Sequence, residues 1–125
     1  MNAPHTLGAD GEQIAAGYLA GNGYRIVARN YRFLRNEIDI VATEGDRICF
    51  IEVKTRASLD KGHPAEAVTP RKQKEIARAA SGYLAGVDGA PPECRFDVVA
   101  ILAQRIENGR IVDYSLEHIK GAFMA

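Results

Sequence analysis

The sequence predicts an α/β domain in which a mixed β-sheet is flanked by helices, in the order helix, three strands, helix, two strands. Three observations support this prediction. Segments with apolar residues at helical spacing alternate with segments that are apolar at every second position or throughout. Turns that contain glycine or proline separate these segments. The length of 125 residues, with 46% hydrophobic and 26% charged residues, suits one domain spanning residues 1–125 with its own core.

The first predicted elements are a helix and a strand. Residues 1–6 are expected to form a loose start. Apolar residues at helical spacing predict a helix over Leu7–Asn22, which ends in a segment with two glycines. A strand is predicted over Tyr24–Arg32.

Two further strands, over 36–44 and 47–56, are predicted to form a hairpin because Gly45-Asp46 offers a tight turn between them. If the turn centres on these two residues, Asp39 lies opposite Glu52. Cross-strand partners have Cβ atoms roughly 4.5–5.5 Å apart. Together with the preceding strand, the hairpin gives an antiparallel meander of three strands.

The chain continues through a loop over residues 57–69 into a second helix. Thr69 as N-cap and Pro70 as the first helical residue predict its start, and it is expected to run to about Gly86. Its buried stripe is predicted to be Ile76, Ala80, Tyr83 and Leu84.

The last part of the chain predicts two strands. Cys94–Ala103 is almost continuously apolar, which is typical of a strand buried on both faces, and the helical crossover allows it to lie parallel to one of the first three strands. The Asn108-Gly109 turn leads to a short strand over 110–114. One or two helical turns are expected over Leu116–Ile119, within a C-terminal appendage of residues 115–125.

The predicted hairpin brings charged residues together at the edge of a core. Glu52 and Lys54 share a strand face whose earlier members are apolar, so both are expected at the mouth of the core, where a charge needs a partner or a metal. The same register sets Glu37 opposite Lys54. Asp39 and Glu52 would repel each other, and a divalent cation would relieve that repulsion. A solvated polar strand face would show the same alternation, so the residues alone leave both interpretations open.

The formal net charge of the chain is zero, so overall charge does not attract nucleic acid, although local patches can. Two basic clusters stand out, although exposed basic residues also serve solubility: Arg25, Arg29, Arg32 and Arg35, and then Arg71, Lys72, Lys74 and Arg78. Cys49 and Cys94 have no disulfide or metal-ligand spacing, and Cys49 is expected in the core. No signal-like start and no apolar segment of ~20 residues is present, which predicts a cytoplasmic protein without a membrane span.

The pattern Asp39 … Glu52-Val53-Lys54 is similar to the motif of the PD-(D/E)xK nuclease superfamily. The whole chain more closely resembles the uncharacterised YraN-like family UPF0102, which itself resembles Holliday-junction resolvases and proteins with a restriction-endonuclease-like fold. Asn36 stands where that family usually has glycine, and asparagine also tolerates a positive φ. The matching segments cover roughly residues 8–103: Gly11-Glu12, Gly23-Tyr24-Arg25-Ile26, Arg29-Asn30-Tyr31-Arg32, Glu37-Ile38-Asp39-Ile40, Phe50-Ile51-Glu52-Val53-Lys54-Thr55-Arg56, Ala67-Val68 with Lys72, and Arg95-Phe96-Asp97-Val98-Val99.

The resemblance implies an endonuclease that uses Mg²⁺ or Mn²⁺ to hydrolyse phosphodiester bonds of nucleic acid, with DNA, and branched DNA in particular, as the expected substrate. Asp39 and Glu52 would bind the metal, with the Val53 carbonyl and Glu12 as further ligands. Lys54 would orient or activate the attacking water. The basic residues expected to hold the nucleic-acid backbone are Arg29, Arg32, Arg35, Arg56, Lys72 and Lys74.

Two other functions are compatible with the same residues. A nucleic-acid-binding module could keep the fold without turnover, and a protein-interaction domain could use the carboxylates only structurally. Resolvase-like proteins act as two-fold dimers, and the candidate dimer surface here is the apolar tail of Ile119, Phe123 and Met124.

Overall fold

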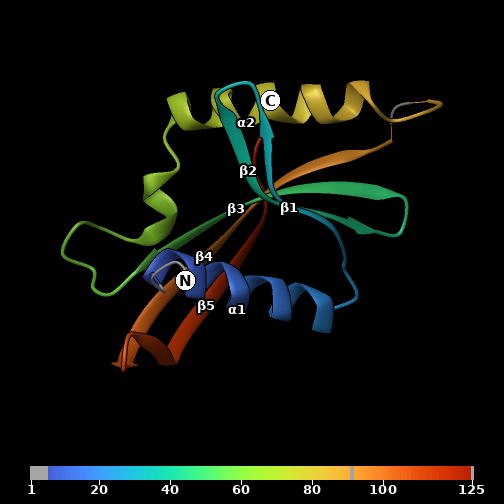
Figure 1. The fold of residues 1–125 in the computed structure, drawn as a ribbon. Coiled ribbons are helices and arrows are strands. Elements are labelled where there is room, and N and C mark those ends of the chain that lie inside the picture. The colour runs from blue at the N-terminus through green and yellow to red at the C-terminus, as the bar shows by residue number, and fades with distance from the viewer. Residues whose placement is uncertain (1–5, 91, 125) are drawn as a thin grey trace, which may run out of the picture.

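The computed structural model describes residues 6–90 and 92–124, and its elements follow the predicted order (Figure 1). They are α1 (Leu7–Gly21), β1 (Arg25–Phe33), β2 (Asn36–Glu44), β3 (Arg47–Arg56), the short 3₁₀ helix η1 (Pro64–Ala67), α2 (Pro70–Ala85), β4 (Cys94–Glu107) and β5 (Arg110–Phe123). The five strands form one sheet in the order β1-β2-β3-β4-β5. Neighbouring strands are antiparallel except β3 and β4, which are parallel. The predicted mixed sheet flanked by helices is therefore confirmed.

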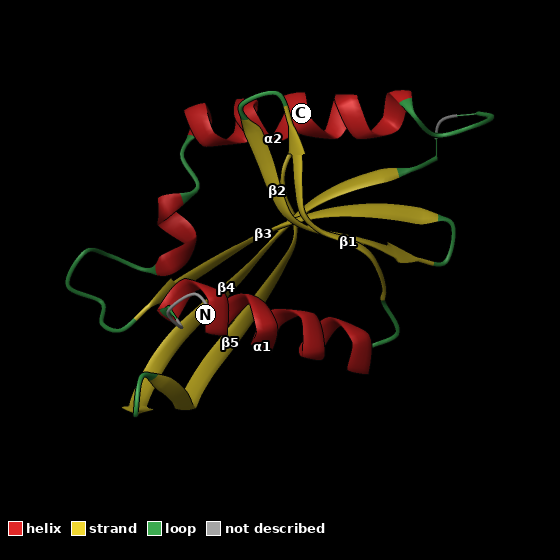
Figure 2. Cartoon of the chain, viewed as in Figure 1, coloured by secondary structure: helices red, strands yellow, loops and turns green. Residues whose placement is uncertain are grey.

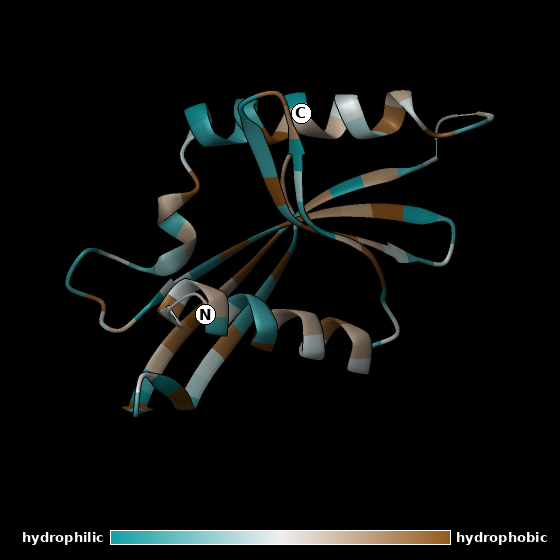
Figure 3. Ribbon diagram, viewed as in Figure 1, coloured by the Kyte–Doolittle hydropathy of each residue, from teal (hydrophilic) through white to brown (hydrophobic). Residues whose placement is uncertain are grey.

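The two helices cover opposite faces of the sheet (Figures 1 and 2). One buried cluster lies between α1 and the sheet and includes Leu19, Ile40, Cys49 and Val99. The other lies between α2 and the sheet and is built around Phe50, packed on its edges by partly buried aromatic residues. The N-terminal half of α2 is hydrophilic and its C-terminal end is apolar (Figure 3), so the start of this helix is free to supply charged groups.

The local signals in the sequence place the helix starts and the β2–β3 hairpin correctly. Thr69 Oγ1 accepts a hydrogen bond from the Lys72 N–H group at 3.3 Å, as expected of an N-cap. Thr6 caps α1 in the same way; the rest of the expected loose start, residues 1–5, lies outside the described residues. In the β2–β3 hairpin, Glu44 pairs with Arg47 and Ile40 pairs with Ile51, which is the predicted register.

The C-terminal segment differs from the prediction. The helical turns expected over Leu116–Ile119 are wrong, because residues 110–123 form the edge strand β5, which pairs with β4 along most of its length. The predicted strand over 110–114 is therefore only the start of a longer one. Backbone pairing with a strand that is itself buried outweighs the weak helical pattern of this segment. The turn before it is as expected, with Asn108 and Gly109 both at positive φ (53° and 76°).

The turn between β1 and β2 also differs in one respect. Its left-handed residue is Leu34, with φ 57°, whereas Asn36 is not among the described residues with positive φ. A bulky residue in this conformation is uncommon.

No helix within residues 6–90 and 92–124 has both the length and the apolar character needed to cross a bilayer.

Candidate functional site

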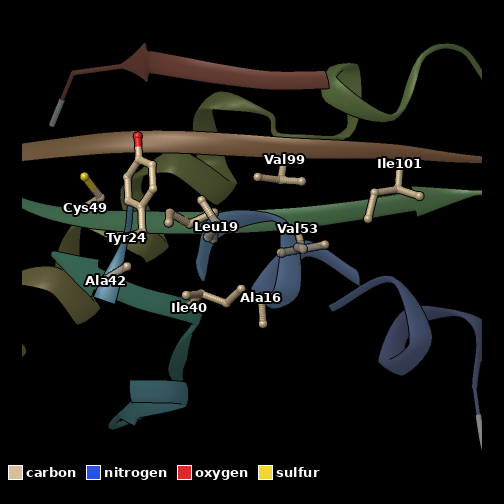
Figure 4. Close-up of a cluster of buried hydrophobic side chains, with 11 residues drawn as sticks. Ala16, Leu19, Tyr24, Ile40, Ala42, Cys49, Val53, Val99 and Ile101 are labelled. Atoms are coloured by element: carbon tan, nitrogen blue, oxygen red, sulfur yellow. The ribbon is translucent and has the colours of Figure 1, made fainter. Parts of the chain in front are cut away.

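Asp39 lies where the pairing between β2 and β3 stops. The ladder runs from Glu44–Arg47 to Ile40–Ile51, and the next residue of β2 uses its side chain instead: Asp39 Oδ2 accepts a hydrogen bond from the Val53 N–H group at 2.8 Å. The Val53 side chain lies in the cluster on the α1 side of the sheet (Figure 4). Alternation along β3 therefore directs Glu52 and Lys54 to the α2 side.

Glu52 is almost completely buried, with 3% of its surface exposed, and two lysines approach one of its oxygens. Lys54 Nζ lies 3.3 Å and Lys72 Nζ 3.8 Å from Glu52 Oε1. Lys72 comes from the first turn of α2. Sequence reasoning placed it among the residues that hold nucleic acid, and the structure brings it into the carboxylate site itself.

Burial shifts both carboxylates toward their neutral forms. Burial raises the pKa of Glu52 to about 7, and the nearby negative charge of Asp39 adds to the rise, while Lys72 and Lys54 oppose it. Burial also raises the pKa of Asp39, against the lowering effects of the Val53 N–H group and the two lysines. The charge of Asp39 thus disfavours ionisation of Glu52, and the site is less favourable when both carboxylates are ionised.

The C-terminal end of β3 also holds buried polar atoms that lack a protein partner. Among the described residues, Glu52 Oε2, Thr55 Oγ1 and Arg56 Nε are buried and accept or donate no hydrogen bond. Most buried polar groups in proteins are paired. Alternation along β3 places Glu52 and Arg56 on the α2 side and Thr55, which packs against Gly11, on the α1 side, so the unpaired Glu52 oxygen is the one that lies in the carboxylate site.

Glu12, on α1, lies near Asp39. Its pKa is raised by burial and by the charge of Asp39, and lowered by Arg29. The Asn30 amide, in the orientation that its neighbours favour, donates to Glu12 Oε1 at 2.9 Å and to Glu37 Oε1 at 3.2 Å. Glu37 also pairs with Arg32 of β1, at 3.3 Å, so its recorded partner is not Lys54 as the extended hairpin register predicts.

Close packing fixes the distance between α1 and β3 at this point. Gly11, directly before Glu12, is buried, and a Cβ atom on it would overlap the Thr55 side chain. Even so, Glu12 does not complete a cluster: among residues 6–90 and 92–124, no three or more His, Cys, Asp or Glu side chains gather closely enough to hold a metal ion.

The other basic residues predicted to contact nucleic acid occupy several places. Arg29 and Arg32 are exposed on β1, where Arg29 Nη1 donates to Gln13 at 2.9 Å. Arg35 lies in the β1–β2 turn and faces α2 across a cavity of about 690 Å³. Lys74 lies on another side of α2, beside Met124, and Arg56 ends β3.

Sequence reasoning missed a second polar network, on the α1 side of the sheet. Asp97 is fully buried and receives a two-pronged ion pair from Arg95, with both distances 2.8 Å. His118 Nε2 lies 2.8 Å from Asp97 Oδ2, and its other ring nitrogen lies 3.2 Å from the Tyr18 hydroxyl. Burial alone would raise the pKa of Asp97, but these partners and the Gly121 N–H group lower it to about 2. An acid inside the apolar segment of β4 is the signal that could have revealed this network.

Of the apolar tail considered as a dimer surface, Ile119 and Phe123 pack against the cluster on the α2 side, and Met124 is 94% exposed. Two of the three residues therefore contribute to the protomer's own core.

Comparison with known proteins places the chain in a family without an established activity. A family model described as "Uncharacterised protein family UPF0102" matches residues 11–101. A UPF0102 protein of Chlorobaculum tepidum is 68% identical over 124 residues, which cover 99% of this chain and 96% of that protein. A UPF0102 protein of Chlorobaculum parvum is 64% identical over 99% of this chain and 96% of that protein. A more distant UPF0102 protein, of Symbiobacterium thermophilum, is 53% identical over 76% of this chain and 80% of that protein. The chain therefore belongs to the uncharacterised protein family UPF0102.

Proposed function

We propose that this protein is a divalent-metal-dependent nuclease with a restriction-endonuclease-like fold, which binds DNA and hydrolyses its phosphodiester bonds. The observation that carries the proposal is the state of Glu52: a buried carboxylate beside Asp39, with one oxygen between two lysines and the other without a partner. Most buried polar side-chain atoms have a hydrogen-bond partner, so the unpaired oxygen of Glu52 supports a ligand at this position.

The residues fit Mg²⁺ or Mn²⁺. Mg²⁺ prefers oxygen ligands and keeps several waters, so two carboxylates suffice as charged ligands. The N–H and C=O groups of one strand residue point toward the same neighbouring strand. The Val53 N–H group points to Asp39 at 2.8 Å, which supports the Val53 carbonyl as a further ligand. When bound, the ion would lower the pKa of a coordinated water and neutralise charge on the phosphate.

The chain's own groups would perform the remaining tasks. Asp39 and Glu52 would hold the ion against the strand end. Lys54, with its ammonium group 3.3 Å from Glu52, would donate to the attacking water and to the oxygens of the phosphate. The oxygen of a water would bond to phosphorus and lose a proton to the solvent, the bond to the leaving oxygen would break, and that oxygen would take up a proton from the solvent. Lys72 would stabilise the negative charge that develops on the phosphate.

The exposed arginines on β1 and in the β1–β2 turn would contact the sugar–phosphate backbone, which positions the substrate without reading its sequence. Branched DNA is the substrate that we would test first.

A second candidate function is a nucleic-acid-binding module without turnover. One finding favours it: in the described part of the chain, no three or more possible ligand side chains gather around one ion position.

A panel of linear, flapped, gapped and four-way-junction DNAs, incubated with Mg²⁺ or Mn²⁺, tests the proposal. We expect the wild type to cleave at least one substrate with either metal, and Glu52→Gln and Asp39→Asn to cleave none. Salt-sensitive binding without cleavage by the wild type would instead support the binding module. If the wild type neither binds nor cleaves any substrate at low salt, a protein-interaction domain would be the remaining interpretation.

A further inference from the structure

The β1–β2 turn presents an apolar side chain to solvent in a strained conformation. Leu34 is 79% exposed and has φ 57°. Non-glycine residues are uncommon in this region, and such residues gather at sites of function. An exposed leucine in an unfavourable backbone conformation adds little to the stability of the fold. Its position therefore suggests a role in binding another molecule.

The turn is held firmly against α2. The Phe33 ring lies so close to Gly82 that a Cβ atom on residue 82 would overlap it. In Figure 1 the turn crosses α2 at the top of the molecule. Leu34 is therefore displayed from a fixed support, one residue beyond an anchored aromatic ring.

The space beside Leu34 is basic. Beside this contact, a cavity of about 690 Å³ is lined by Leu34, Arg35 and Asn36 of the turn and by Arg71, Glu75 and Arg78 of α2. The three residues from α2 are spaced so that they share one helix face. Glu75 is the single carboxylate among three guanidinium groups, and its ion pair with Arg71 is long, at 3.7 Å, and exposed. Such pairs are weak, so Arg71 remains available to an anion such as a backbone phosphate.

The residues that line the cavity are close in the chain to residues of the carboxylate site. Asn36, at the cavity, is three residues along β2 from Asp39, a separation of roughly 10 Å. On α2, Arg71 precedes Lys72, whose ammonium group lies 3.8 Å from Glu52. A DNA strand held at the carboxylates would reach the arginines within roughly three nucleotide steps.

We propose that Leu34 recognises an interruption in stacked duplex DNA: it packs on the face of a base exposed by a missing nucleotide, while Arg35, Arg71 and Arg78 hold the flanking phosphates. This inference rests on the proposed DNA binding and specifies the form of DNA. In proteins that kink DNA, apolar side chains, leucine among them, insert between base steps. An intact duplex offers no open base face, so the leucine favours interrupted DNA.

The test compares two DNAs that differ in one nucleotide: an intact duplex and the same duplex with a single-nucleotide gap. Binding is measured by fluorescence anisotropy with Ca²⁺ in place of Mg²⁺. The variant is Leu34→Asn, because asparagine accepts a positive φ and the turn is kept. The matched control is Ile106→Asn, which removes an apolar side chain, 42% exposed, near the β4–β5 turn.

We expect the wild type and Ile106→Asn to bind gapped DNA about tenfold tighter than intact DNA, a difference of about 1.4 kcal/mol in binding free energy. Leu34→Asn should lower this ratio to below about twofold while its affinity for intact duplex stays unchanged. Arg78→Ala should weaken binding to both DNAs and lower the salt slope by about one. A 2-aminopurine placed at the gap should change fluorescence on binding the wild type but not Leu34→Asn.

The inference is overturned if the wild type shows no preference for the gap, or if Leu34→Asn keeps the preference. A wild type that binds neither DNA overturns the proposed DNA binding as well. A preference that depends on Leu34, in a protein that cleaves nothing with Mg²⁺ or Mn²⁺, would support gap recognition and reject hydrolysis.

Discussion

The carboxylate of Asp39 accepts the hydrogen bond of the Val53 N–H group at 2.8 Å, in the place where a backbone carbonyl of β2 would otherwise continue the ladder. This bond gives Asp39 a structural role in addition to the proposed metal-binding role. The two roles can be separated, because an amide oxygen can accept the same hydrogen bond without carrying the charge.

Asp39→Asn should therefore fold with nearly wild-type stability, whereas Asp39→Ala should lose about 1 kcal/mol of the free energy of unfolding, because a buried N–H group is left unpaired. Both variants should lose metal binding and cleavage. Urea denaturation and calorimetric titration with Mn²⁺ measure the two properties separately. If Asp39→Asn binds Mn²⁺ like the wild type, Asp39 is not a ligand.

Adding metal should stabilise the wild type, because the ion relieves the repulsion between Asp39 and Glu52 and binds only the folded chain. At free Mn²⁺ about 100-fold above the dissociation constant, the gain is about 2.7 kcal/mol, which corresponds to a rise in Tm of roughly 10 °C. Thermal unfolding followed by circular dichroism measures this. Glu52→Gln should show no rise, and an equal rise in that variant would mean that the metal binds elsewhere.

Lys72 and Lys74 are two residues apart on α2 but should behave differently. Lys72 reaches Glu52 Oε1 at 3.8 Å, whereas Lys74 lies beside Met124 on another side of the helix. Lys72→Met should lower the cleavage rate by about 10²-fold, within the range for loss of one group that stabilises a transition state. Lys74→Met should change it by less than about twofold. Single-turnover rates on the best substrate compare the two, and equal losses would contradict the placement of Lys72 in the site.

Two glycines of α1 should respond in opposite ways to the same substitution. Gly11→Ala should destabilise the protein by about 1–3 kcal/mol, because the new Cβ atom overlaps Thr55 and moves Glu12 away from the site. Gly17→Ala should stabilise it by about 0.5–1 kcal/mol, since nothing lies within 4 Å of the added atom and alanine favours the helix. Chemical denaturation of both variants measures the difference, and equal stabilities would mean that α1 is not held against β3.

The ion pairs of Asp97 predict how stability depends on acid. The pKa of Asp97 is lowered from 3.8 to about 2 in the folded protein, so the folded state binds fewer protons than the unfolded chain between these values. The contribution of ionised Asp97 to the free energy of unfolding is on the order of 2 kcal/mol. It is fully present above pH 4 and is lost as the pH falls toward 2.

Asp97→Asn should lower the free energy of unfolding by about 3–5 kcal/mol at pH 7, because Arg95 loses its buried partner. The difference in the free energy of unfolding between this variant and the wild type should become smaller as the pH falls from 4 to 2. Urea denaturation at each pH measures this difference. The control is Asp113→Asn, an exposed position on β5. A stability difference that stays constant down to pH 2 would show that the ion pairs do not lower the pKa of Asp97.

The sequence by itself determined the features that depend on near neighbours in the chain. Thr69-Pro70 set the start of α2, and Gly45-Asp46 set the β2–β3 register from Glu44–Arg47 to Ile40–Ile51, because caps and tight turns are formed by residues only a few positions apart. The order of elements followed from the same signals together with the apolar character of β4.

Only the tertiary structure decided what depends on distant segments. Leu116–Ile119 became a strand because β4 offered a ladder, and His118 joined Asp97 through that pairing. Lys72 reached Glu52 while Lys74 turned away, which a list of basic residues could not distinguish. Such contacts join residues far apart in the chain, and their geometry is set by how helices and strands pack, which local patterns do not encode.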